Sequence, residues 1–230
     1  MKWSAQSITR LINTERYIPE PIELEAVEAM MQRGSIASFD NHQYITRKGD
    51  GHPRLCVMLS GYARLTAFTE DGKEMLSHFI QPGDCWGAHP CLGDFDETND
   101  GIAEAPCEVL IVSAEDVNEL MWEFRSFQRA MVKVLCSRLN LAVQVASQLG
   151  VHNSSQRLAW RLSLMSKNAH PGSFTSEISV SQESLAAMIG LTRQRTNFLL
   201  RELEKDGVIA LRYNKIEILD IERLKAMSAK

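Results

Sequence analysis

The pattern of apolar positions is most regular in the C-terminal third of the chain, where it predicts two short helices. Two largely apolar groups recur at the spacing of a buried helical face: Leu185, Ala186 and Ile189, then Thr196, Leu199, Leu200 and Leu203. Ser181 and Thr192 precede these groups and are residue types that cap helices. Gly190 separates the groups, and Asp206-Gly207 ends the second. The sequence therefore predicts a helix-turn-helix.

The outward face of the second helix carries side chains that suit double-stranded DNA. Arg, Gln and Asn match base edges in the major groove, and an aromatic ring can contact a thymine methyl group. The expected DNA-contacting residues are Ser181, Gln182, Thr192, Arg193, Gln194, Arg195, Asn197, Phe198, Arg201 and Lys205. Alternating residues around Tyr213-Asn214-Lys215 predict two short strands and a tight turn, which would make a winged helix. The alternative is a helical bundle without nucleic acid.

Residues 125–149 contain no Gly or Pro and predict one long helix with two apolar stripes. The first stripe has the 3-4-3-4-3 spacing of a coiled-coil seam and consists of Val132, Leu135, Leu139, Ala142, Ala146 and Leu149. The second consists of Met131, Val134, Leu141 and Val145, interrupted by Arg138. One stripe can pack on its own subunit while the other meets a second copy, so we expect a dimerisation helix over residues 116–150. The alternative buries both stripes within one subunit.

The N-terminal half predicts many short strands. Turn signals recur at Lys48-Gly-Asp-Gly51, Ser60-Gly61, Glu70-Asp-Gly-Lys73, Pro82-Gly-Asp84 and Leu92-Gly-Asp94. Between them lie strand-length segments such as 55–59, 62–68 and 75–80, and helical patterns occupy residues 23–32 and the region after Ser113. Evenly spaced short strands favour a compact antiparallel barrel or roll. We therefore expect an α+β protein whose residues 1–115 form a β-roll, a double-stranded β-helix of the jelly-roll type.

Charge divides the chain in the same way. Residues 151–230 carry 12 Lys and Arg against 8 Asp and Glu, a net charge of +4, whereas residues 1–150 carry 13 against 21, a net charge of −8. A basic C-terminal module is what a DNA-binding domain requires, so we assign residues 151–230 to it. We place the hinge between domains at residues 150–155, where Ser154 or Ser155 is expected to cap a new helix. With no membrane-length apolar run and no secretory segment, we expect a cytoplasmic protein without membrane contact.

Most of the cysteines are expected to be small core residues and not reactive or metal-binding groups. They are Cys56, Cys85, Cys91, Cys107 and Cys136, an odd number without a Cys-x-x-Cys pair. Cys85, His89 and Cys91 form the one local group that could hold a metal or haem, although its spacing matches no common zinc pattern. The chain contains no nucleophile elbow, phosphate loop or paired-carboxylate motif, so we expect no enzymatic activity.

The order of these parts resembles the bacterial cyclic-AMP receptor protein and fumarate-nitrate regulator family of transcription factors. The resemblance covers residues 35–230 and rests on Leu59-Ser-Gly61, Asp71-Gly-Lys-Glu74, Pro82-Gly-Asp84, Gly190-x-Thr-Arg-Gln194 and Glu204-x-x-Gly207-x-Ile209. It implies a β-roll sensor, a dimerisation helix and a winged helix-turn-helix. It also implies a homodimer on a palindromic promoter site, with RNA polymerase as a further partner. A sensor that acts through a different protein partner is the alternative.

Departures from the family pattern concern the effector. The cyclic-AMP-binding members of the family carry a glutamate, an arginine and a serine at three positions that contact the nucleotide. By the resemblance, these positions correspond to Ala88, Glu97 and Thr98 in this chain, and the adenine-contacting helix positions correspond to Ala142 and Val143. Glu97 would repel a phosphate, so we expect no cyclic AMP binding. The candidate pocket consists of Trp86, Gly87, Ala88, His89, Glu97, Thr98, Arg138, Ala142 and Val143.

The resemblance offers two further kinds of sensor, an iron–sulfur cluster and a haem. The cluster needs N-terminal cysteines, and no cysteine precedes Cys56, so we do not expect one. Haem-binding members place a histidine near the position of His89 but also need a cysteine two residues earlier, where this chain has Gly87. Cys85 and Cys91 lie close in the sequence, so haem stays open as an alternative.

Overall fold

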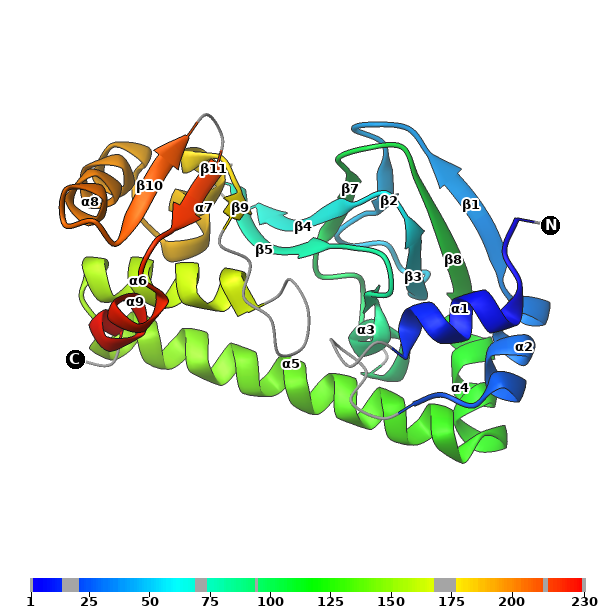
Figure 1. Cartoon of the computed structure of the whole chain (residues 1–230). Coiled ribbons are helices and arrows are strands. Elements are labelled where there is room, and N and C mark those ends of the chain that lie inside the picture. Colours follow the sequence, from blue (N-terminus) through cyan, green and yellow to red (C-terminus); the bar gives the residue numbers. More distant parts are fainter. Residues whose placement is uncertain are drawn as a thin grey trace. The chain divides into compact units, whose positions relative to one another are not determined.

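The computed structural model describes residues 2–13, 21–68, 74–93, 95–167, 177–212 and 215–228 (Figure 1). The chain forms two compact units. The first contains the described residues up to Phe68 and those from Ser77 to Asn140, and the second contains those from Leu141 onward together with residues 74–76 at the start of a strand. The units therefore divide within helix α5 (Arg125–Val151), whereas the sequence places a domain boundary after residue 150.

The first unit contains two four-stranded sheets that form the expected β-roll. One sheet has the order β1-β8-β3-β6 and the other β2-β7-β4-β5. Their strands are β1 (Ser35–Phe39), β2 (Tyr44–Thr46), β3 (Arg54–Ser60), β4 (Ala63–Phe68), β5 (Glu74–Ile80), β6 (Cys85–Trp86), β7 (Asp100–Ala103) and β8 (Cys107–Ser113). The three strand segments expected from the sequence correspond to β3, β4 and β5. Gly61 and Gly83 adopt positive φ angles of 76° and 91°, which confirms the turns expected there.

Strand β3 lies between two cores, and this explains why its sequence is apolar at almost every position. Cys56 and Met58 point into the interior of the roll, while Leu55, Val57 and Leu59 point to the opposite face, where helices pack. A strand that is buried on both faces needs no polar alternation. Strand β8 shares this arrangement and pairs antiparallel with β3, so the two strands form the centre of the unit.

Four helices and the first part of α5 cover the outer face of β3 and β8. They are α1 (Ala5–Ile12), α2 (Leu24–Arg33), α3 (Ala88–Gly93) and α4 (Ala114–Glu123). The sequence predicted α2 and α4 but missed α1 and α3. Ser4 and Ser7 form a capping box at the start of α1, a signal that the sequence did contain. The expected turn at Leu92-Gly93-Asp94 is wrong for its first two residues, which end α3, while Asp94 lies outside the described residues.

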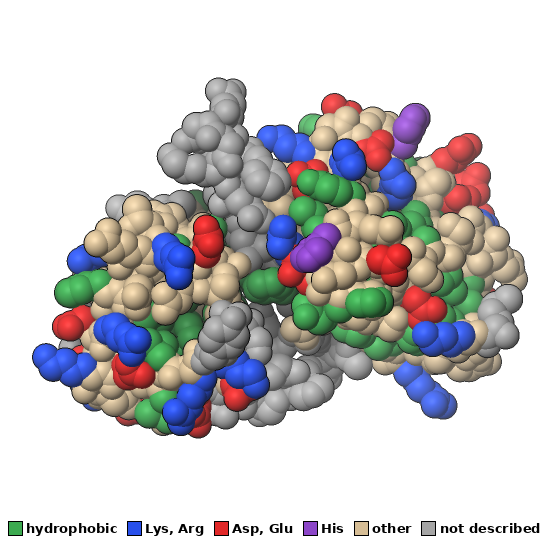
Figure 2. All heavy atoms as spheres, turned by 90° about the horizontal axis from the view of Figure 1, so that it is seen from above, with side chains coloured by type: hydrophobic (Ala, Val, Ile, Leu, Met, Phe, Trp, Pro, Cys, Tyr) green, Lys and Arg blue, Asp and Glu red, His purple; other side chains and the backbone are tan. Residues whose placement is uncertain are grey.

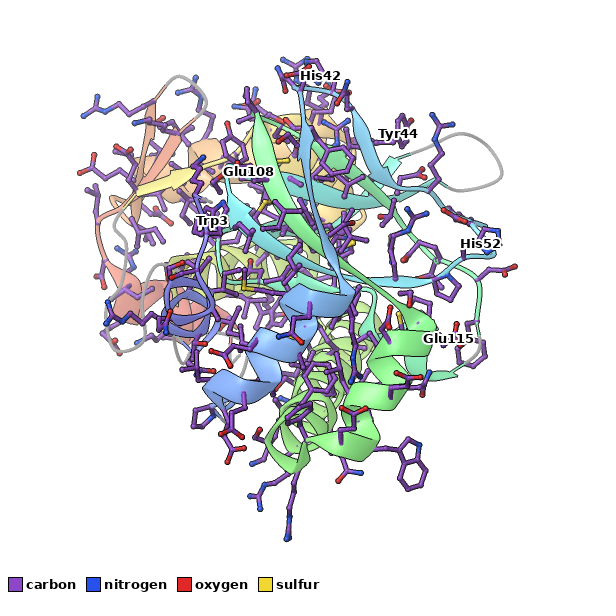
Figure 3. All side chains as sticks on the ribbon, turned by 90° about the vertical axis from the view of Figure 1, so that its right-hand side faces the viewer. Trp3, His42, Tyr44, His52, Glu108 and Glu115 are labelled. Carbon is purple, nitrogen blue, oxygen red and sulfur yellow. The ribbon has the colours of Figure 1, made fainter. Side chains whose placement is uncertain are left out.

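The start of α1 is attached to the sheet through Glu108 on β8. Oε2 of Glu108 accepts hydrogen bonds from Lys2 Nζ at 2.5 Å, Trp3 Nε1 at 3.1 Å and Ser60 Oγ at 3.0 Å, and Figure 3 shows Trp3 and Glu108 side by side. The hydrogen bond from Lys2, with those from Trp3 and Ser60, lowers the pKa of Glu108. Glu108 therefore connects residues that are far apart in the sequence.

The second unit is a winged helix-turn-helix. It contains α6 (Ser154–Lys167), β9 (Glu177–Ser179), α7 (Gln182–Ile189), α8 (Arg193–Lys205), β10 (Ile209–Arg212), β11 (Lys215–Ile218) and α9 (Ile221–Ser228). Its sheet has the order β10-β11-β9, and α6 packs against α7 and α9. The sequence predicted β10 and β11 but missed β9 and α9. The expected turn at Tyr213-Asn214 lies outside the described residues.

The cap of α6 differs from the expectation. Neither Ser154 nor Ser155 caps this helix, because Oδ1 of Asn153 accepts hydrogen bonds from the backbone N–H groups of Ser155 and Gln156, both at 3.0 Å. The side chain of Gln156 in turn accepts from the N–H of Asn153 at 2.7 Å. This reciprocal pair satisfies three backbone donors, the N–H groups of Asn153, Ser155 and Gln156. Among the helices in the described ranges, none is long and apolar enough to cross a bilayer.

Candidate nucleic-acid interface

The two helices of the helix-turn-helix have the caps that the sequence predicts. Ser181 Oγ accepts from the N–H of Ser184 at 3.0 Å, and Thr192 Oγ1 accepts from the N–H of Arg195 at 3.2 Å. Gly190 ends α7 with φ 65° and ψ 39°, the left-handed conformation that glycine adopts without strain. The buried residues are those expected: Leu185, Ala186, Ile189, Thr196, Leu199, Leu200 and Leu203. The packing of α7 and α8 therefore leaves the polar face of α8 in solvent.

Every expected DNA-contacting residue is at least partly accessible on this unit. Exposed members of the set are Thr192, Arg193, Gln194, Arg195, Phe198, Arg201 and Lys205, and half-buried members are Ser181, Gln182 and Asn197. Gln182 Nε2 donates to Asn197 Oδ1 at 3.5 Å, which links the two helices at the edge of this face. Figure 2 shows Lys and Arg side chains spread over the surface of the second unit, with hydrophobic side chains between them. Such a surface can contact both phosphates and base edges.

Phe198 is the apolar member of this face. Its ring is 54% exposed, and the guanidinium carbon of Arg195 lies 5.2 Å from the ring centroid. A cation at this distance is attracted by the face of the ring. About half of Phe198 is exposed on α8, so this part of the side chain is available for contact with another molecule.

Glu204 connects the recognition helix α8 to the wing, a role that the sequence did not reveal. Its Oε1 accepts from the N–H of Leu211 on β10 at 3.0 Å, and its Oε2 accepts from Arg201 Nη1 at 2.7 Å. The hydrogen bond from Leu211, followed by the one from Arg201, lowers the pKa of Glu204. Glu204 therefore fixes the orientation of Arg201 on the exposed face of α8.

The long helix α5 exposes one of its two apolar stripes. Val132 is 49% exposed, Leu139 is 66% exposed and Val143, next to the stripe, is 55% exposed. Ala142 and Ala146 are exposed as well, Leu135 is half-buried, and the side chain of Leu149 lies outside the described residues. In the second stripe Met131 and Val134 belong to the core of the first unit. The alternative in which both stripes are buried within one subunit is therefore wrong for the described part of α5.

The candidate effector pocket is only partly assembled by the first unit. Trp86 and Ala88 are buried, and the guanidinium of Arg138 donates to the carbonyl oxygen of Cys85 at 3.4 Å. Gly87 has φ 86°, and a Cβ on it would lie 2.0 Å from the carbonyl oxygen of Arg54. Only glycine fits there. Thr98, Ala142 and Val143 are exposed, and the last two belong to the second unit.

Glu97 is buried rather than solvated. It is 6% exposed, and Oε1 accepts from the N–H groups of Thr98 at 3.0 Å and Asn99 at 3.4 Å. Among the described residues, its Oε2 has no hydrogen-bond partner. Burial raises the pKa of Glu97, although the N–H groups of Asn99 and Thr98 counteract this. The sequence places Glu97 in the candidate pocket but could not show that its side chain is buried.

The three residues considered as an alternative metal or haem site, Cys85, His89 and Cys91, are not brought together. Cys85 and Cys91 lie in the core beneath the helices, whereas His89 is exposed and stacks on Phe95 with ring centroids 5.0 Å apart. Burial raises the pKa of Cys85 to about 11 and that of Cys91 to about 12. Both thiols are therefore neutral core groups, as expected for most of the cysteines. Over the described ranges, no three His, Cys, Asp or Glu side chains are placed to share a metal ion.

Comparisons with known proteins match both units. Residues 36–123 match the cyclic nucleotide-binding domain, and residues 156–227 match the Crp-like helix-turn-helix domain. The chain is 22% identical over 188 residues to the global nitrogen regulator of Synechocystis sp., covering 80% of this chain and 84% of the relative. It is 21% identical over 189 residues to the cAMP-activated global transcriptional regulator CRP of Pasteurella multocida, covering 80% and 90%.

Solved structures share the same fold. The structure of FixK2 from Bradyrhizobium japonicum aligns with a TM-score of 0.73 at 17% identity, covering 86% of this chain and 98% of that chain. The α+β architecture predicted from the sequence, with a β-roll, a long helix and a winged helix-turn-helix, is therefore confirmed. Because both domain models match in this order and the relatives span four fifths of the chain, the protein belongs to the Crp/Fnr family of transcriptional regulators.

Proposed function

We propose that the protein is a homodimeric regulator that binds a palindromic DNA site and responds to a signal other than cyclic AMP. The observation that carries the DNA-binding part is the exposed face of α8. Arg193, Gln194, Asn197 and Phe198 share one side of the helix, opposite its buried residues. The same proposal includes a cytoplasmic location and contact with RNA polymerase, because a bacterial transcriptional regulator acts where DNA and the polymerase are.

Each side chain on α8 has a distinct proposed role. Arg193 stands at the first position of the helix and is exposed, so its planar guanidinium can pair with O6 and N7 of a guanine. Gln194 suits an adenine, and Phe198 can pack on a thymine methyl group. Lys205 at the end of the helix contacts phosphates, which adds affinity without sequence information. Arg201, whose guanidinium donates a hydrogen bond to Glu204, also contacts phosphates.

Dimerisation is supported by the exposed stripe of α5. Val132, Leu139 and Ala142 have the 3-4 spacing of a seam, and isolated exposed side chains would not repeat in this way. A parallel pair of α5 helices would give the protein two recognition helices related by a two-fold axis. The half-sites would then lie about 34 Å apart, centre to centre.

The proposed independence from cyclic AMP rests on Glu97. A buried carboxylate with one unpaired oxygen disfavours a phosphate in its neighbourhood, because two negative charges in a poorly solvated place repel each other. The cyclic AMP named for the Pasteurella multocida relative is a property of that protein, and the residues of this chain do not support its transfer.

A selection from randomised DNA duplexes tests the proposed function. The full-length protein should recover a symmetrical site with two half-sites about one helical turn apart. Sedimentation of the same preparation should show a dimer, and addition of millimolar cyclic AMP should leave the affinity for the selected site unchanged. Recovery of an unsymmetrical site, or of no site, would contradict the proposed arrangement of the recognition helices.

A further inference from the structure

Three buried polar side-chain atoms on residues around the β-roll have no hydrogen-bond partner among the described residues. They are Oε2 of Glu97, Nε1 of Trp86 and Oγ1 of Thr46. The three residues are 6%, 5% and 4% exposed, so bulk water does not solvate them. A buried polar group without a partner destabilises the folded state, and native interiors pair nearly all such groups. Three of them in one small domain indicate a place for a molecule that supplies the partners.

Trp86 and Glu97 both lie close to Cys56. Trp86 on β6 is directly opposite Cys56 on β3, and both side chains belong to the core inside the roll. Burial raises the pKa of the Cys56 thiol, and the negative charge of Glu97 raises it further. That electrostatic effect requires the Glu97 carboxylate to lie near the thiol. Trp86 and Glu97 therefore both neighbour Cys56, and the charge of Glu97 acts in the same way on Cys91 in the core beneath the helices.

Thr46 belongs to the opposite sheet but points to the same interior. It pairs with Gly101 on β7, and a Cβ on Gly101 would lie 2.5 Å from Thr46 Oγ1 and 3.4 Å from Leu65 Cδ2. Leu65 is part of the core inside the roll, so the hydroxyl of Thr46 borders that core. The roll interior thus offers a carboxylate oxygen, an indole donor and a hydroxyl group.

The charges around Glu97 define what can bind. Its Oε1 is held by the N–H groups of Thr98 and Asn99, which leaves Oε2 in a fixed orientation. His89, which is exposed on α3, favours the charged form of Glu97, whereas Asp50, which forms an ion pair with Arg54, disfavours it. None of the ion pairs among the described residues involves Glu97. A buried carboxylate in this state is stabilised by a cation with N–H donors and destabilised by an anion.

We infer that the roll interior binds a small organic cation, whose protonated amine or amidine donates a hydrogen bond to Oε2 of Glu97. Trp86 Nε1 can donate to an acceptor on the same molecule, and Thr46 Oγ1 can donate or accept. This inference rests on the proposal that the β-roll is the sensing domain, and it names the chemical class of the signal. Anionic effectors, cyclic nucleotides included, are excluded by the same carboxylate.

Ligand-observed NMR with a charge-matched series of probes tests this. Benzylamine, agmatine and 1,4-diaminobutane serve as cations, with benzyl alcohol and benzoate as the neutral and anionic counterparts of the first. At least one cation should bind the full-length protein saturably and more tightly than benzyl alcohol and benzoate. Glu97→Gln removes the charge at nearly constant shape and should weaken that binding about tenfold or more, because hydrogen bonds to charged groups are the strong ones.

Two further variants make the result decisive. Glu115→Gln removes an exposed carboxylate on α4 (Figure 3) and should leave binding unchanged. Trp86→Phe keeps an aromatic ring but removes the N–H; because none of the three cations carries an acceptor for that N–H, this variant should also leave their binding unchanged. The inference is overturned if no cation binds better than its neutral counterpart, or if Glu97→Gln binds as the wild type does. The DNA-selection experiment does not depend on ligand binding, so a failure of the cation to bind would leave the proposed DNA binding intact.

Discussion

Leu139→Glu should convert the proposed dimer into monomers without unfolding the protomer. Leu139 lies in the middle of the exposed stripe of α5 and is 66% exposed, so its side chain contributes little to the core of its own subunit. In a parallel pair of helices it would face its counterpart across the two-fold axis. The substitution would therefore remove apolar contact at the seam and place two carboxylates opposite each other.

The magnitude follows from the exposed fraction. Complete burial of a leucine side chain is worth about 1.5–3 kcal/mol, so burying the exposed two thirds is worth about 1–2 kcal/mol per subunit. Two subunits give about 2–4 kcal/mol, which corresponds to a Kd weaker by about 30-fold to 1,000-fold. Repulsion between the two new carboxylates adds to this loss.

Sedimentation equilibrium over a range of protein concentrations measures this Kd directly. Gln144→Glu is the matched control, because Gln144 is exposed on the side of α5 away from the seam and receives the same charge. Thermal unfolding should show that Leu139→Glu keeps a folded protomer. If Leu139→Glu and Gln144→Glu dimerise equally well, the subunits associate through a different surface and the assignment of the seam is wrong.

The other predictions concern DNA, nucleotide, backbone and pH. Arg193→Ala should cost about 1–3 kcal/mol of DNA affinity and relax selection at one base pair, whereas Lys205→Ala should weaken all sequences alike in gel-shift titrations, and equal behaviour of the two would contradict their roles. Millimolar cyclic AMP should leave the melting temperature unchanged, whereas a ligand of the folded state would raise it. Gly87→Ala should lower the melting temperature far more than Gly49→Ala, because both glycines have positive φ but only at Gly87 would a Cβ strike the backbone. Burial raises the folded-state pKa of Glu97, so the contribution of this group to stability is present below its unfolded-state pKa and is lost as pH rises through its folded-state pKa. Glu97→Gln should therefore flatten this part of a profile of melting temperature measured from about pH 4 to pH 8. An unchanged profile would show that Glu97 does not titrate in this range.

The sequence by itself determined the elements whose signals are local. A capping residue, a 3-4 apolar spacing and a terminating glycine all lie within a few residues of each other, so α7 and α8 could be predicted to their ends and to their buried residues. The same is true of the two stripes of α5, since helical periodicity alone decides which residues share a face. The family resemblance rested on short motifs in a fixed order along the chain, and the matches to both domain models confirm it.

Only the tertiary structure decided which side chains those elements enclose. Strand β9 exists because Ser179 pairs with Lys215, a partner distant in the sequence, and no local pattern in a three-residue segment announces it. Glu97 is drawn inward because its backbone N–H donates to the carbonyl of Asp50 and its carbonyl accepts from Gly49, so a loop far away in the chain sets its burial. Sequence periodicity can assign a residue to a face, but burial of a charged side chain depends on contacts between distant segments. The recognition helix α8 could therefore be predicted from the sequence, whereas the burial of Glu97 could not.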